Sequence, residues 1–184
     1  GYALFFERRY LLYLMLLPVV ALLVPEIRDR LLDLGSGTEA VGYAKLNSFA
    51  WRLSIWESGL QWMRPSHYLF GYGVEAFRHF SQTFFPSANK MDWGAHNVYV
   101  QWFFDAGVIG LCAYLFLYGR MVMTLQALRR VDKLAAFITV SIVIVYLVVS
   151  SSDNMFGYLV FNWYFWFVVG AGCALLAATS PALN

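Results

Sequence analysis

The stretch Gly94-Ala-His-Asn-Val-Tyr-Val-Gln-Trp-Phe-Phe-Asp-Ala-Gly-Val-Ile-Gly110 joins a polar loop to a strongly apolar segment. It places His96 and Asn97 where a helix is expected to enter a membrane. Polar and ionisable groups are costly in hydrocarbon, so those kept at a membrane boundary are candidates for function. We therefore expect any activity of this chain to centre on His96.

The composition of the whole chain is that of a membrane protein. Of its 184 residues, 60% are hydrophobic, 19% aromatic and 13% charged, whereas an average soluble domain has about 25% charged residues. The formal net charge of +2 is too small to indicate nucleic-acid binding. Cys112 and Cys173 both lie in apolar segments, so no disulfide framework is expected.

Four apolar runs predict an all-α integral membrane protein with four transmembrane helices in a single membrane domain, residues 1–184. The chain does not begin with Met, and its first run lacks the cleavage site of a signal peptide. It is therefore interpreted as part of a longer polytopic protein. The expected spans are residues 10–24, 97–119, 134–150 and 155–178.

Basic residues near the span ends predict the orientation, because cytoplasmic loops carry an excess of Lys and Arg. One such cluster precedes the first span and another separates the second from the third, so both mark the same side. Both termini are then cytoplasmic, while the loop 25–96 and the turn 151–154 face outward. The two clusters are Arg8 and Arg9, and Arg120, Arg129, Arg130 and Lys133.

The large outer loop is expected to contain interfacial helices. One helix should stop before Pro65, which disfavours helical geometry at the residue before it. Gly71-Tyr-Gly73 predicts a turn, and Val74–Phe80 a short helix after it. Apolar residues recur at helical spacing before Pro65 and predict the apolar stripe of the first helix: Leu46, Phe49, Ala50, Leu53, Trp56, Leu60 and Met63.

His96 is the candidate general base, because a neutral imidazole can take up a proton near pH 7. The alternative is that His96 only makes a hydrogen bond at the start of the helix. Asn97 is expected either to orient a substrate or to cap that helix. Asp105, about 13 Å deeper along a straight helix and on its opposite face, is interpreted as a structural carboxylate satisfied by a neighbouring helix.

Arg52 and Asp153 are candidates for substrate binding. The Arg52 guanidinium, among aromatic residues in the outer loop, suits a phosphate or pyrophosphate group through a forked contact. The alternative is a pair with Glu57 or with lipid headgroups. Asp153 and Asn154 lie in the short outer turn, where they could complete the site or cap the fourth span.

No metal or cofactor is expected in this chain. The sequence has no His/Cys/Glu cluster with metal-ligand spacing, no nucleophile elbow and no phosphate-binding loop. Any enzyme here would rely on acid–base and electrostatic catalysis.

Three segments, taken in order, resemble the O-antigen ligase/polymerase family. That family has an arginine-bearing helix, a G-x-G turn and an HN-x-Y step into a membrane helix. The matching segments are Trp51-Arg52-Leu-Ser-Ile-Trp56, Gly71-Tyr-Gly-Val-Glu-Ala-Phe77 and His96-Asn97-Val-Tyr-Val. Asp105-Ala-Gly107 and Gly110 resemble the continuation, with Asp where Glu is more usual. The resemblance covers roughly residues 10–178.

The resemblance implies a glycosyltransferase of the bacterial inner membrane with its site on the periplasmic side. It implies an undecaprenyl-pyrophosphate-linked glycan as donor, with inversion at the sugar and no metal. His96 would deprotonate the acceptor hydroxyl, and Arg52 would hold the carrier's pyrophosphate. The chain then corresponds to the C-terminal portion of such an enzyme, in contact with membrane lipids.

Several alternatives stay open at this point. A ligase, a polymerase and a protein oligosaccharyltransferase would share the donor and differ in the acceptor. A truncated, non-catalytic relative would instead be an accessory subunit, with other membrane subunits as partners. Solute transport is disfavoured because the sequence lacks the repeated broken helices of such proteins.

Overall fold

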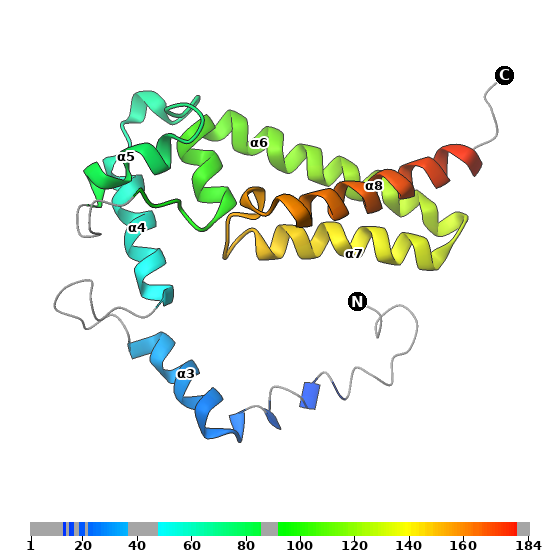
Figure 1. Cartoon of the computed structure of the whole chain (residues 1–184), viewed down its shortest axis with the longest axis horizontal. Coiled ribbons are helices and arrows are strands. Elements are labelled where there is room, and N and C mark those ends of the chain that lie inside the picture. The colour runs from blue at the N-terminus through cyan, green and yellow to red at the C-terminus, as the bar shows by residue number, and fades with distance from the viewer. Residues whose placement is uncertain are drawn as a thin grey trace. The chain divides into compact units, whose positions relative to one another are not determined.

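Figure 1 shows the computed structural model, which describes residues 13, 15–16, 19–20, 22–36, 48–85 and 92–179, with side chains omitted at 30, 31 and 33–36. These residues form helices and turns and no strand, which confirms the all-α class. The chain separates into two compact units, Gly1–Glu57 and Ser58–Asn184, and each is described by itself.

The first unit contains α3 (Pro25–Ser36) and the larger part of α4 (Ser48–Trp62). The end of α4 confirms the helix expected before Pro65. Within the expected apolar stripe, Ala50 is buried while Phe49 and Leu53 are exposed, and the fully buried Ile55 lies off that stripe. Apolar and aromatic residues occur all around this helix, so their spacing does not select one face. The expected span 10–24 includes residues outside the described part and stays a prediction.

The second unit is built around three helices that lie side by side, α6, α7 and α8 (Figure 1). Tyr118, Tyr146 and Phe165 are buried between them, with 5.5 Å between the two tyrosine rings and 4.4 Å from Tyr146 to Phe165. The elements of this unit are η2 (Pro65–His67), α5 (Ala76–Phe84), α6 (Val98–Gln126), η3 (Ala127–Arg130), α7 (Lys133–Val149), η4 (Met155–Gly157) and α8 (Leu159–Thr179).

Two helices in the described residues are long and apolar enough to cross a membrane. They are Val98–Arg130, which joins α6 to η3, and α8. The apolar helix α7 has 17 residues, or about 25 Å, somewhat less than the roughly 30 Å of a hydrocarbon core. The chain is therefore a helical protein with membrane-crossing candidates, and the expected number of four spans stays a prediction.

A break at Gly107 divides α6, where the backbone leaves helical geometry at φ 68° and ψ −168°. The first section, 98–106, crosses the end of the bundle, and the second, 108–126, runs beside α7 and α8 (Figure 1). The second section is about 28 Å long, close to the roughly 25 Å of α7 and 31 Å of α8. The helix expected over 97–119 is therefore present but interrupted at Gly107, and the greater depth expected for Asp105 stays a prediction.

The loop 68–73 supplies the backbone hydrogen bonds that the break removes from α6. Tyr72 and Gly73 donate N–H groups to the carbonyls of residues 104 and 105, at 3.1 and 2.8 Å. The carbonyls of residues 68 and 69 accept from the N–H groups of residues 108 and 109, at 2.8 and 3.2 Å. Because every backbone group inside a membrane protein needs a partner, this loop is what makes the break tolerable.

Glycine is required at two points of this contact. A Cβ atom on Gly71 would lie 2.3 Å from the backbone of residue 105, and one on Gly107 would lie 2.3 Å from that of residue 69. Both residues also have positive φ, which side chains disfavour. The turn expected at Gly71-Tyr-Gly73 is confirmed, and the helix expected after it is found slightly later, as α5.

An aromatic cluster joins the end of α4, the loop, α5 and the first section of α6. Tyr72 lies in its middle, stacked on His67 with 3.9 Å between ring centres and packed on Trp62 at 5.2 Å and Phe104 at 5.1 Å. These ring contacts therefore hold Tyr72, and with it the end of the loop 68–73, against α4 and α6. The other members of the cluster are Phe77, Phe80 and Phe84.

Candidate functional site

The start of α6 is held by the turn between α7 and α8. The Val98 N–H donates to the carbonyl of Ser150 at 2.8 Å, and the Asn97 side-chain amide donates to the carbonyl of Ser151 at 2.9 Å. The same Asn97 side chain accepts hydrogen bonds from the N–H groups of residues 99 and 100. Asn97 is thus the N-cap of α6 and ties the helix to the turn.

His96 precedes this cap in a left-handed backbone conformation, with φ 47°. Such a conformation is uncommon for residues other than glycine. It persists only where the surrounding structure enforces it, and it then gives the side chain a defined direction. Here the neighbouring contacts are those of Asn97 and Val98 with the α7–α8 turn. The cap hydrogen bonds come from Asn97, so His96 is not needed as the helix cap.

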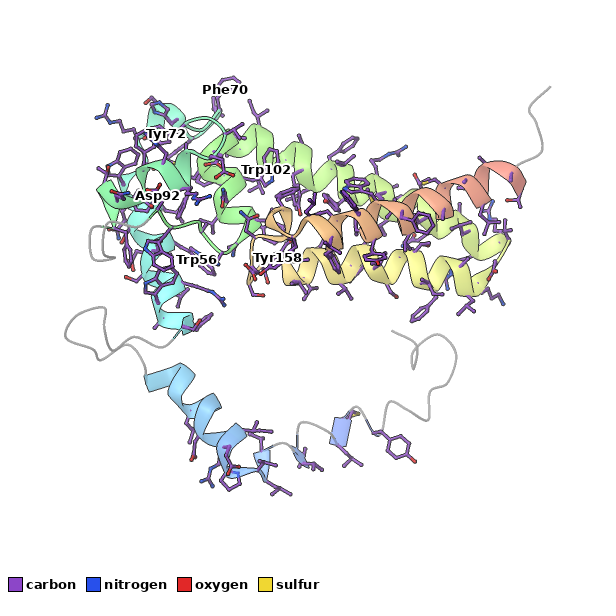
Figure 2. All side chains as sticks on the ribbon, viewed as in Figure 1. Trp56, Phe70, Tyr72, Asp92, Trp102 and Tyr158 are labelled. Carbon is purple, nitrogen blue, oxygen red and sulfur yellow. The ribbon has the colours of Figure 1, made fainter. Side chains whose placement is uncertain are left out.

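The imidazole of His96 faces the carboxylate of Asp153. Its Nδ1 atom lies 3.5 Å from Asp153 Oδ1, and the two side chains are 37% and 32% exposed. The pair is therefore preorganised by the protein and still accessible to a substrate. It lies at the end of the bundle where α7 meets α8, next to Tyr158, which Figure 2 labels.

Asp153 is fixed as the charged carboxylate. The Tyr158 hydroxyl donates to Asp153 Oδ2 at 2.5 Å, and the N–H of Asn154 donates to Oδ1 at 2.8 Å. Burial raises the pKa of Asp153, but these two hydrogen bonds and the His96 imidazole outweigh it and lower the pKa below its ordinary value. The carboxylate is therefore ionised at neutral pH and faces Nδ1 of His96 as an acceptor.

A chain of side chains extends from this pair into α6. The Asn154 amide donates to Gln101 Oε1 at 3.0 Å, and the Gln101 amide lies 3.5 Å from Asp105 Oδ2. Gln101 is buried, and its hydrogen bond with Asn154 links α6 to the turn between α7 and α8. Sequence reasoning missed both Gln101 and Tyr158. Gln101 could have been noticed as a glutamine inside an otherwise apolar helix. Nothing in the sequence distinguished Tyr158 from the other tyrosines.

Asp105 has a structural position. Its carboxylate accepts hydrogen bonds from the N–H groups of Glu75 at 3.1 Å and Phe77 at 2.8 Å, at the start of α5. A carboxylate is favourable there because the first N–H groups of a helix lack partners and carry the positive end of its dipole. This confirms the expectation of a carboxylate satisfied by a neighbouring helix.

The structure brings together three of the four predicted site residues. His96, Asn97 and Asp153 meet at the end of the bundle in the second unit. Arg52 lies on α4 in the first unit, where it is half-buried. Among the described residues no group of three or more His, Cys, Asp or Glu side chains is arranged to hold a metal ion.

A neutral imidazole that faces a carboxylate is suited chemically to act as a base towards a hydroxyl group. Nδ1 of His96 faces Asp153, so the proton of a substrate hydroxyl would be taken up by the other ring nitrogen, Nε2. The carboxylate would stabilise the imidazolium that forms. The geometry therefore suits reactions in which a hydroxyl becomes a nucleophile.

The O-antigen ligase family model matches residues 2–115, more than half of the chain. No curated protein and no solved structure matches the chain. The matched region contains Arg52, the glycine turn, His96 and Asn97, whereas Asp153 lies beyond it and was joined to the site by the fold. The chain therefore belongs to the O-antigen ligase family, which makes it a membrane protein of a glycosyltransferase-like kind.

Proposed function

We propose that this protein transfers a glycan from an undecaprenyl-pyrophosphate carrier to an acceptor hydroxyl at the periplasmic face of the bacterial inner membrane. The observation that carries the proposal is the accessible His96–Asp153 pair at the end of a bundle of apolar helices. A lipid-linked donor and a polar acceptor would meet at such a boundary. Family membership supports glycosyl transfer as the reaction class.

His96 acts as the general base. Its Nε2 atom takes the proton of the acceptor hydroxyl while the oxygen attacks the anomeric carbon of the donor sugar. The bond between that carbon and the pyrophosphate oxygen breaks, and undecaprenyl pyrophosphate leaves with the electron pair. A single displacement of this kind inverts the configuration at the anomeric carbon. No metal takes part.

Asp153 and Asn97 assist His96 in different ways. Asp153 holds the imidazole by its Nδ1 atom, so that Nε2 can take up the proton, and stabilises the charge that develops on the ring. Asn97 fixes the backbone at His96 through the cap and the contact with Ser151. Both residues were expected to bind the substrate, and that direct contact stays a prediction.

Arg52 binds the pyrophosphate of the carrier. A guanidinium can offer two parallel N–H donors to phosphate oxygens, and it is more weakly hydrated than an ammonium group. Support comes from this chemistry and from the place of Arg52 in the matched part of the chain. The leaving pyrophosphate would be stabilised by the same contact.

The His96→Asn variant tests the proposal. Asparagine tolerates the left-handed backbone of residue 96, so the variant should fold, but it has no group of suitable basicity. We expect transfer of a lipid-linked glycan by the full-length protein in vesicles to fall about 10²- to 10⁴-fold at unchanged protein level. Near-normal transfer would exclude His96 as the base and would favour the alternative of a non-catalytic accessory subunit.

The Arg52→Lys variant tests the pyrophosphate contact separately. The charge is kept but the forked geometry is lost, so transfer should drop strongly although the protein inserts normally. Arg78→Lys is the matched control, because Arg78 is an exposed arginine on α5 outside the proposed site. An arginine that only contacts lipid headgroups would tolerate lysine, and full activity of the Arg52 variant would show this.

A further inference from the structure

The tip of the loop 68–73 exposes consecutive apolar side chains. Tyr68 is 41%, Leu69 57% and Phe70 71% exposed. Figure 2 shows Phe70 directed outward from the loop, whereas Tyr72 belongs to the aromatic cluster. In water, these three side chains would gain little of the free energy that burying their apolar surface provides. Something apolar is therefore expected to cover the tip.

The position of the tip indicates what covers it. The carbonyls of Tyr68 and Leu69 are bonded to the N–H groups of Val108 and Ile109, in the first turn after the break in α6. Val108 and Ile109 are themselves 42% and 49% exposed. They begin a section of about 28 Å that matches the thickness of a hydrocarbon core. The tip is thus continuous with the exposed apolar surface of α6, at the start of its long apolar section.

The loop cannot turn these side chains inward. Four backbone hydrogen bonds and two glycine contacts hold it against α6, and Tyr72 is held in the aromatic cluster. The nearest charged residues on either side, Arg64, Glu75 and Arg78, are exposed. Apolar and aromatic side chains flanked by arginines are typical of segments at the boundary between headgroups and acyl chains.

We propose that Tyr68, Leu69 and Phe70 form a membrane anchor that inserts into the lipid leaflet on the side of His96. The anchor places the break at Gly107 at the level of the membrane surface. The first section of α6, which carries the His96–Asn97 step at its start, then lies along that surface. The proposal rests on the membrane setting of the family and does not depend on His96 acting as a base.

Spin labels on the full-length protein test the anchor. Cys112 and Cys173 are first replaced by alanine, and single cysteines are placed at Phe70, at Phe116 and at Thr83. The labelled proteins are reconstituted in vesicles of phosphatidylethanolamine and phosphatidylglycerol, and collisions with oxygen and with a water-soluble nickel chelate are measured. Phe116 is the lipid reference, because it is 70% exposed in the middle of the α6 span, nearly as much as Phe70. Thr83, exposed on α5, is the aqueous reference.

The label at Phe70 is expected to collide mainly with oxygen and little with the nickel chelate, as at Phe116. Strong collision with the nickel chelate, as at Thr83, would overturn the anchor. Weak collision with both reagents would also overturn it, because the tip would then be covered by protein. A label at Leu69 repeats the test if the Phe70 variant is poorly produced.

Discussion

The first section of α6 is held at both ends by another part of the chain, but the two ends use different chemistry. At Gly107 the contacts are between backbones, made by the loop 68–73 without any functional side chain. At His96 one backbone hydrogen bond, from Val98 to Ser150, is accompanied by side-chain contacts of Asn97 with the turn between α7 and α8 and of His96 with Asp153. One end fixes geometry, and the other carries ionisable groups that remain accessible.

The difference separates structural from functional constraint in this molecule. Gly71 and Gly107, which make the backbone contacts at the break, tolerate almost no substitution. A Cβ atom on either residue would lie 2.3 Å from a neighbouring backbone. Side-chain contacts at His96 tolerate substitution sterically but not chemically. Substitutions of the close-packed glycines at the first end should therefore destabilise the fold, and those at the second end should lower activity in folded protein.

The largest effect on folding is expected for Gly71→Ala. The new methyl group would meet the backbone of residue 105, and alanine is disfavoured at φ 69°. Strain and overpacking together should cost about 3 kcal/mol or more. Thermal unfolding in detergent, followed by the amount of monodisperse protein, measures the loss.

Gly73→Ala is the matched control for that variant. Gly73 also has positive φ, but a Cβ atom there would meet nothing within 4 Å. Only the backbone strain remains, about 1–2 kcal/mol. Equal losses for the two variants would contradict the importance of the close contact between the loop and α6.

At the other end, Asp153→Asn should impair transfer without loss of folded protein. The amide keeps the shape of the side chain but no longer stabilises a charged His96 ring. We expect a fall of about 10- to 100-fold, less than for loss of the base itself. Initial rates of glycan transfer measure it, and an unchanged rate would remove Asp153 from the site.

The charge on Asp153 should also appear in the pH dependence of stability. Its pKa is lowered in the folded state, so its contribution is present above the ordinary carboxyl pKa of 3.8 and is lost as the pH falls through the lowered value. The difference in Tm between wild type and Asp153→Asn should therefore be largest near neutral pH and shrink towards pH 3. A difference that grew on acidification would contradict the lowered pKa.

The smallest effect on activity is expected at Asp105. Asp105→Ala removes the acceptor at the start of α5 and should cost about 1–2 kcal/mol of stability. Transfer per folded molecule should stay close to that of wild type, because Asp105 lies two side chains away from the pair. A loss as large as that of Asp153→Asn would place Asp105 in the catalytic machinery.

The sequence predicted the helical class, the helix before Pro65 and the glycine turn, because these depend on local patterns of residues. It did not predict the break at Gly107, since a glycine in an apolar run is also compatible with a straight membrane helix. The break depends on a loop distant in sequence that supplies the missing hydrogen bonds. Such pairing is not visible in the spacing of either segment.

The candidate site shows the same limit. His96, Asn97 and Asp153 were identified because polar residues at the ends of apolar runs are unusual. Their pairing could not be derived, because Asp153 belongs to a different helix connection. Tyr158 and Gln101 were missed, since their roles exist only once α8 and α6 are brought against the same turn.

Double substitution at His96 and Asp153 tests the central claim most directly. If Asp153 acts only through His96, adding Asp153→Asn to the His96→Asn variant should cause no further fall in the transfer rate. The rates of the two singles, the double and wild type are measured on the same lipid-linked glycan in vesicles. A double variant as slow as His96→Asn alone is the predicted result. A rate reduced by the product of the two single effects would show that the residues act independently and would contradict the account.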